Sequence, residues 1–86
     1  MKIEKIKSSY IHGYKLGRYY LIKCYEWGNY YEWIISDILD SFSCSIDRRK
    51  AYENKDIKYV DSCASGKKLL LQLENGAIKF EDIKGR

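Results

Sequence analysis

The chain has 86 residues, enough for one domain (1–86) and too few for a deep, enclosed active site. Its hydrophobic content of 45% and charged content of 33% are those of a folded domain, which argues against disorder. The net charge of +4 permits nucleic-acid binding without requiring it. Because the sequence has neither a long apolar run nor a signal-peptide block, we expect a cytoplasmic protein of a bacterial cell or phage host.

The pattern of the N-terminal third of the sequence predicts β-strands. Residues 10–17 predict a strand that closes at Leu16-Gly17, and residues 2–7 extend the same pattern. Residues 19–33, YYLIKCYEWGNYYEW, then predict a β-hairpin at 27–30, with Gly28-Asn29 as a two-residue type II′ turn. In that register, Ile22 faces Ile35 and Trp27 faces Tyr30.

Alternation of side chains along the two strands divides this hairpin into two faces. The apolar face, predicted as core, contains Tyr20, Ile22, Cys24, Tyr31, Trp33 and Ile35. The other face mixes rings with charges and contains Tyr19, Leu21, Lys23, Tyr25, Trp27, Tyr30, Glu32 and Ile34. We expect the second face to be exposed unless a helix covers it.

The period-2 pattern breaks in residues 37–53, where we expect a helical connection, including a short turn from Ser45 to Tyr52. Residues 57–63 predict a strand, followed by a turn at 64–66. The segment KKLLLQLENGAIKF, residues 67–80, predicts a second hairpin at 74–77, with Asn75-Gly76 as a type I′ turn. The predicted fold class is α+β: a small antiparallel sheet or partly open barrel of about 5–6 strands with one helical connection.

The reactive side chains do not form a familiar catalytic or metal-binding pattern. Cys24, Cys44 and Cys63 are widely spaced, and the close cysteine pair typical of zinc sites is missing. His12 is the only histidine. A small His/Cys enzyme or metal protein is therefore the least favoured reading, and we expect no catalytic residue, no metal and no cofactor.

Aromatic and basic residues interleave along the N-terminal strands, and this pattern suggests a binding surface. The predicted partner-binding residues are Tyr14, Arg18, Tyr19, Lys23, Tyr25, Trp27, Tyr30, Arg48 and Arg49. Tyrosine, tryptophan and arginine are enriched at protein–protein hot spots. The same residue types bind single-stranded nucleic acid, with the rings stacking on bases and the cations neutralising phosphates.

Two function classes follow from this surface. The first is a non-enzymatic interaction protein that inhibits or regulates a larger protein, such as a nucleic-acid-handling host complex. Small single-domain proteins of this kind are frequent among phage and mobile-element inhibitors of host defence, including anti-CRISPR proteins, which is an analogy of class rather than of motif. The alternative is a module that binds single-stranded nucleic acid or nucleotides. Its stacking residues would be Tyr10, Tyr14, Tyr19, Tyr25 and Trp27, and its phosphate-binding residues Lys15, Arg18, Lys23, Arg48 and Arg49. In both cases, the sequence also allows a homodimer formed through an exposed strand.

Overall fold

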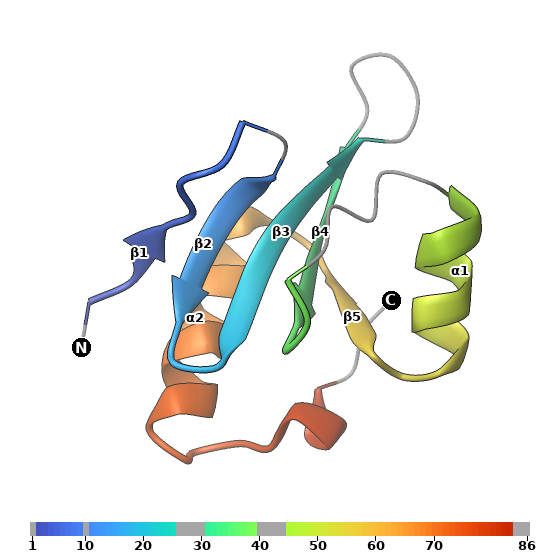
Figure 1. The fold of residues 1–86 in the computed structure, drawn as a ribbon. Coiled ribbons are helices and arrows are strands. Elements are labelled where there is room, and N and C mark those ends of the chain that lie inside the picture. The colour runs from blue at the N-terminus through green and yellow to red at the C-terminus, as the bar shows by residue number, and fades with distance from the viewer. Residues whose placement is uncertain (1, 10, 26–30, 40–44, 84–86) are drawn as a thin grey trace.

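The computed structural model describes residues 2–9, 11–25, 31–39 and 45–83. In this part of the chain, five antiparallel strands form one open sheet in the order β1-β2-β3-β4-β5 (Figure 1). The strands are β1 (Glu4–Lys5), β2 (His12–Leu16), β3 (Tyr19–Tyr25), β4 (Tyr31–Ser36) and β5 (Ile57–Val60). The fold is thus of the predicted α+β class, with an open sheet rather than a barrel.

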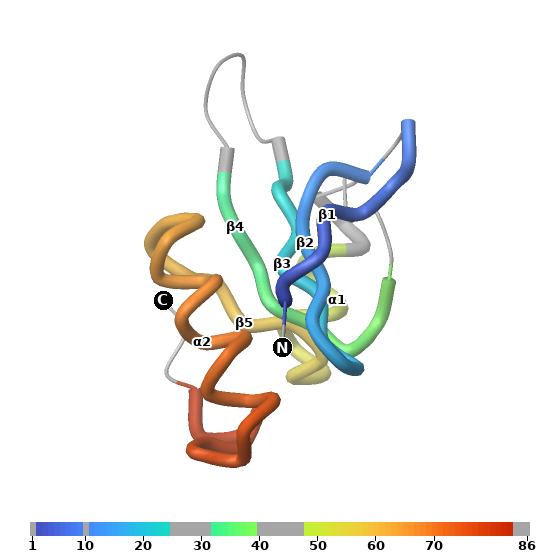
Figure 2. Tube along the Cα trace, turned by 90° about the vertical axis from the view of Figure 1, so that its left-hand side faces the viewer, coloured from blue at the N-terminus to red at the C-terminus, as the bar shows by residue number. Residues whose placement is uncertain are grey.

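Two α-helices in the described ranges pack on the sheet. Helix α1 (Ser45–Glu53) connects β4 to β5, and helix α2 (Cys63–Glu74) follows β5 and leads to a short 3₁₀ helix, η1 (Phe80–Asp82). Figure 2 shows α2 standing to one side of the sheet, opposite the side that carries α1. The sheet is therefore the middle layer between the two helices.

Each face of the sheet has its own core. On the α2 side, the buried residues are Leu16, Leu21, Ile35, Val60, Leu70, Leu73 and Ile83. On the α1 side, they are Ile22, Cys24, Ile34, Ala51 and Ile57. Because β3 and β4 are covered on both faces, adjacent residues such as Leu21 and Ile22 are both fully buried. A doubly covered strand reads as a continuous apolar run rather than as an alternation.

Several predicted elements are confirmed. Strand β2 lies within the predicted 10–17 strand and ends at a turn in which Gly17 has a positive φ of 62°. Helix α1 lies within 37–53, and β5 begins at the predicted residue 57. Strands β3 and β4 pair as neighbouring antiparallel strands, as a hairpin requires.

The predicted register of that hairpin is wrong by one residue. The structure pairs Ile22 with Ile34 and Tyr25 with Tyr31, so five residues, 26–30, connect the strands. A shift of one residue moves a side chain to the other face relative to the partner strand. Trp33 consequently packs with the α2-side core rather than beside Ile22. The predicted turn at Gly28-Asn29 lies outside the described residues.

The predicted second hairpin, at 74–77 within residues 67–80, is also wrong, because this region contains most of α2. Ser62 is the N-cap of this helix, and its hydroxyl accepts a hydrogen bond from the Ser65 N–H (3.1 Å). The predicted turn at 64–66 is therefore its first turn. Asn75 caps the other end, and Gly76 follows with a φ of 81°. A glycine with positive φ after the last helical turn is a common helix stop, so Asn-Gly here ends a helix rather than joining two strands.

A basic groove at one end of the sheet

A groove of about 550 Å³ lies where the start of β3, the end of β4, the start of β5 and η1 come together. Antiparallel pairing brings these strand ends side by side. The turn after α2 then returns the chain, so that η1 reaches the same place. The groove is lined by two rings, Tyr19 and Phe80; by four cations, Arg18, Lys55, Lys58 and Lys79; and by two carboxylates, Asp37 and Glu81. We call it the basic groove.

The two rings form its apolar part. Tyr19 and Phe80 stack with ring centroids 5.7 Å apart and planes inclined by 24°. The guanidinium carbon of Arg18 lies 5.4 Å from the Tyr19 centroid, and Nζ of Lys58 lies 5.8 Å from the Phe80 centroid. Both distances are within the range of a cation–π interaction. Each ring therefore already has an aromatic neighbour and a cationic neighbour within the chain.

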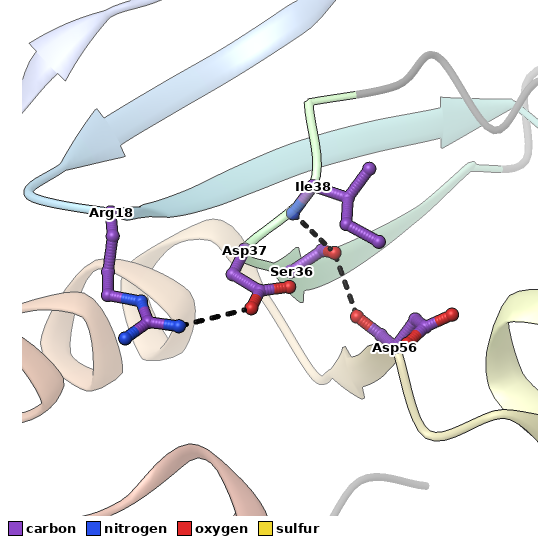
Figure 3. Close-up of polar contacts among 5 residues, drawn as sticks. All are labelled: Arg18, Ser36, Asp37, Ile38 and Asp56. Atoms are coloured by element: carbon purple, nitrogen blue, oxygen red, sulfur yellow. Dashed lines mark hydrogen bonds and ion pairs between the residues drawn. The ribbon is translucent and has the colours of Figure 1, made fainter.

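The cations outnumber the carboxylates by two, from four cations and two acids. Arg18 forms an ion pair with Asp37, with Nη2 3.4 Å from Oδ2 (Figure 3). Among the residues that the structure describes, Lys55, Lys58 and Lys79 have no carboxylate within ion-pair distance. The groove thus contains three lysines that no described carboxylate neutralises.

The backbone on which Asp37 sits is held by a buried serine. Ser36, at the end of β4, is fully buried, and its hydroxyl donates to the carbonyl of Asp56 (2.8 Å). The same hydroxyl accepts from the N–H of Ile38 (3.0 Å). Figure 3 shows Ser36 placed between these two segments. One side chain therefore ties the segment after β4 to the residue that precedes β5.

Lys55 lies at the end of α1 in a backbone conformation unusual for lysine. Its φ is 62°, in the left-handed region, and its N–H donates to the carbonyl of Tyr52 (3.1 Å). The N–H of Asp56 donates to the carbonyl of Ala51 (2.8 Å), which completes the helix-ending hydrogen bonds. Glycine is the residue most often found at such a position.

A second hollow, of about 390 Å³, adjoins the basic groove. It is lined by Tyr52, Glu53, Lys55, Ile57 and Lys58. We call it the Tyr52 hollow. Tyr52 is 48% exposed, and its ring lies 5.6 Å from the ring of Tyr59. Lys55 and Lys58 line both hollows and so lie between them.

The predicted partner-binding residues do not form one open sheet face. Arg18 and Tyr19 belong to the basic groove. Tyr14 instead lies half-buried on the α2 side, where its ring stacks on Trp33 (6.4 Å) and carries Lys67 Nζ 4.1 Å from its centroid. Helix α2 thus covers the face that we expected to be exposed, which is the alternative that the sequence left open.

The remaining predicted residues are scattered. Arg48 is only 3% exposed, so it is not part of a surface, whereas Arg49 is exposed on α1 away from the groove. Lys23 is half-buried on β3. The side chain of Tyr25 is not described, and Trp27 and Tyr30 lie outside the described residues, as does Tyr10 of the nucleic-acid alternative. Lys15 pairs with Glu4, with Nζ 3.8 Å from the carboxylate, and does not line the basic groove.

Most of the groove was not predicted as a site. The sequence predicts Lys58, Lys79 and Phe80 only as strand residues and assigns no role to Lys55. Lys79 and Phe80 reach the groove because η1 follows α2. The sequence indicates the position of η1 only if Asn75-Gly76 is interpreted as the end of a helix.

The described residues contain no cluster of three or more histidine, cysteine or acidic side chains that could hold a metal. Cys24 is buried and Cys63 is half-buried. No helix in the described ranges is long and apolar enough to cross a membrane. Comparisons with protein-family models, with characterised proteins and with solved structures returned no match, so the chemistry of the groove is argued from its own residues.

Proposed function

We propose that the chain is a small non-enzymatic binding protein that docks on a larger protein through the basic groove and thereby inhibits or regulates it. The observation that carries this proposal is the stacked pair of Tyr19 and Phe80, with Arg18 beside one ring and Lys58 beside the other. Arginine and aromatic side chains gathered in one depression are typical of the few residues that dominate protein–protein affinity. We further propose that it acts in the cytoplasm of a bacterial cell or phage host.

The mixed charge of the groove supports a protein partner. Asp37 and Glu81 lie among the four cations, and a protein surface can match both signs with its own acidic and basic side chains. A nucleic-acid backbone carries a negative charge at every nucleotide, so it cannot place uncharged or cationic groups beside the two carboxylates as a protein segment can. The two rings are also already engaged with each other and with cations, which leaves less open aromatic surface for bases to stack on.

Single-stranded nucleic acid is the second candidate, favoured by one observation. The cationic excess of the groove, with Lys55, Lys58 and Lys79 unpaired among the described residues, suits a phosphate backbone. Such binding would weaken steeply with rising salt, because condensed counterions are released from the nucleic acid when the protein binds.

A capture experiment with matched charge reversals tests the proposal. The wild-type chain, Lys79→Glu and Lys68→Glu would each be immobilised and exposed to nuclease-treated lysate of cells in which the protein is made. Lys79 lines the groove, whereas Lys68 is exposed on α2 outside it, and both variants change the net charge equally. We expect one protein to be retained by the wild type and by Lys68→Glu but lost with Lys79→Glu. Equal retention of the protein by both variants would contradict the proposal. So would a parallel capture from untreated lysate in which the chain retains nucleic acid and no protein.

A further inference from the structure

The basic groove and the Tyr52 hollow meet at two shared lysines. Lys55 and Lys58 line both, whereas every carboxylate lines only one: Asp37 and Glu81 the basic groove, and Glu53 the Tyr52 hollow. Each hollow also has its own aromatic surface, Phe80 with Tyr19 in one and Tyr52 in the other. The combined surface is therefore cationic at its centre and carries rings and carboxylates on either side.

The two hollows lie on different sides of β5. Lys58 pairs with Ile35, which belongs to the α2-side core, and Lys58 lies beside Phe80. Ile57 belongs instead to the α1-side core, and it lines the Tyr52 hollow with Tyr52 of α1. A ligand that fills both hollows must therefore extend across the start of β5. A small anion is too short to do so. An extended peptide, which rises by roughly 3.3 Å per residue, is long enough.

The position of Lys55 supports a role for its charge. It occupies a left-handed position after α1, where a lysine carries a steric cost that glycine would not. Residues held in such conformations concentrate at binding and active sites. Lys55 lines both hollows and therefore lies on the border between them.

We propose that the two hollows together bind one extended acidic segment of the partner protein. Carboxylates of the segment pair with Lys55 and Lys58, and its apolar side chains lie against Phe80 on one side and Tyr52 on the other. Alternate residues of an extended peptide point in opposite directions, so a sequence in which acidic and apolar residues alternate suits this surface. This inference rests on the proposed function and names the chemistry of the partner at that site.

An NMR titration of the whole ¹⁵N-labelled chain tests this inference. The probe is a short capped peptide of alternating glutamate and leucine, and the control is its glutamine–leucine counterpart. We expect the acidic probe to shift the backbone amides around Lys55, Lys58, Tyr52 and Phe80, and the neutral peptide to shift them much less. Absence of these shifts at millimolar probe, or equal shifts with the neutral peptide, would overturn the inference. Stronger shifts of the same amides with oligothymidylate of equal charge would also overturn it, in favour of nucleic acid.

Three variants that should all fold normally refine the test. Lys55→Asn removes the charge with a residue that tolerates the left-handed conformation, and we expect it to weaken probe binding about fivefold, the upper range for one exposed ion pair. Lys55→Arg retains the charge and should retain binding. Lys68→Gln, on the exposed side of α2, loses the same charge and should bind as the wild type does. Equal weakening by Lys55→Asn and Lys68→Gln would mean that only net charge matters, which overturns the inference.

The capture and titration experiments fail independently. If Lys79→Glu abolishes partner capture while the acidic probe shifts no amide near Lys55, the docking function stands and the acidic segment is wrong. If Lys79→Glu leaves capture unchanged, the docking function itself is wrong, and binding of the acidic probe would then reflect only a local affinity of the lysines.

Discussion

Arg18 and Asp37, which both line the basic groove, form an ion pair with Nη2 3.4 Å from Oδ2. Their side chains are 73% and 37% exposed, so solvent screens the pair and it contributes little to folding. Asp37 nevertheless holds a guanidinium that also lies 5.4 Å from the Tyr19 ring. A ligand carboxylate that approaches Arg18 must therefore compete with Asp37.

Asp37→Asn should consequently increase affinity for the acidic probe by about twofold to fivefold while changing the free energy of unfolding by less than about 1 kcal/mol. Urea denaturation and probe titration measure the two quantities. Asp82→Asn removes one exposed carboxylate that does not line the groove and should leave probe affinity closer to that of the wild type. An equal gain in both variants would show that Asp37 has no specific effect.

A second prediction concerns the left-handed residue Lys55. Lys55→Gly removes backbone strain of about 1–2 kcal/mol. It adds a glycine entropy cost of about 0.5–1 kcal/mol and loses a favourable charge at the helix end, about 0.3–1 kcal/mol. The expected net change is close to zero, in contrast to the loss of probe binding. Urea denaturation tests this, and a destabilisation well above about 1 kcal/mol would show that Lys55 is a structural residue.

The different success of the α1 and α2 predictions has a physical cause. Local signals suffice to predict α1, because Ser45 starts a polar, helix-compatible run between two apolar strands. In α2, the consecutive residues Leu69, Leu70 and Leu71 fit either a strand or a helix. The helical period is visible only in the buried set Gly66, Leu70 and Leu73, spaced four and three residues apart.

The register and the groove could not be obtained from local patterns. With both faces of β3 and β4 covered, a one-residue shift still leaves apolar residues on each face, so the hydrophobic pattern does not select one register. The basic groove combines the start of β3 with Lys79 and Phe80, more than fifty residues later in the sequence. Predicting the groove requires the path of the chain after α2. The hairpin predicted at 74–77 gives a different path, because it turns the chain back beside a strand.

A third prediction tests the packing of α2 on the sheet. Gly66 lies directly against Leu21, and a Cβ at position 66 would overlap Cδ1 of Leu21 and lie 2.9 Å from its Cδ2. Gly66→Ala should therefore destabilise the chain by about 1–3 kcal/mol, despite the higher helix propensity of alanine. Thermal or urea denaturation measures the change.

Lys68→Ala is the matched control on the exposed side of the same helix, and it should change stability by less than about 0.5 kcal/mol. Combining Gly66→Ala with Leu21→Ala should cost less than the sum of the two single changes, because the smaller side chain makes room for the new methyl group. Strict additivity would mean that the two residues do not interact as closely as described.

The fourth prediction links the fold to the groove through Ser36. Its hydroxyl donates to Asp56 and accepts from Ile38, so Ser36→Ala leaves a carbonyl and an N–H without this partner. The loss of buried hydrogen bonds should destabilise the chain by about 1–3 kcal/mol. Because the same bonds fix Asp37 and the approach to β5, NMR should also show amide shifts at Arg18 and Lys58 in the absence of ligand. Ser9→Ala, at an exposed position, should change neither quantity. If Ser36→Ala loses stability but leaves the amides of Arg18 and Lys58 unshifted, Ser36 supports the fold without positioning the groove.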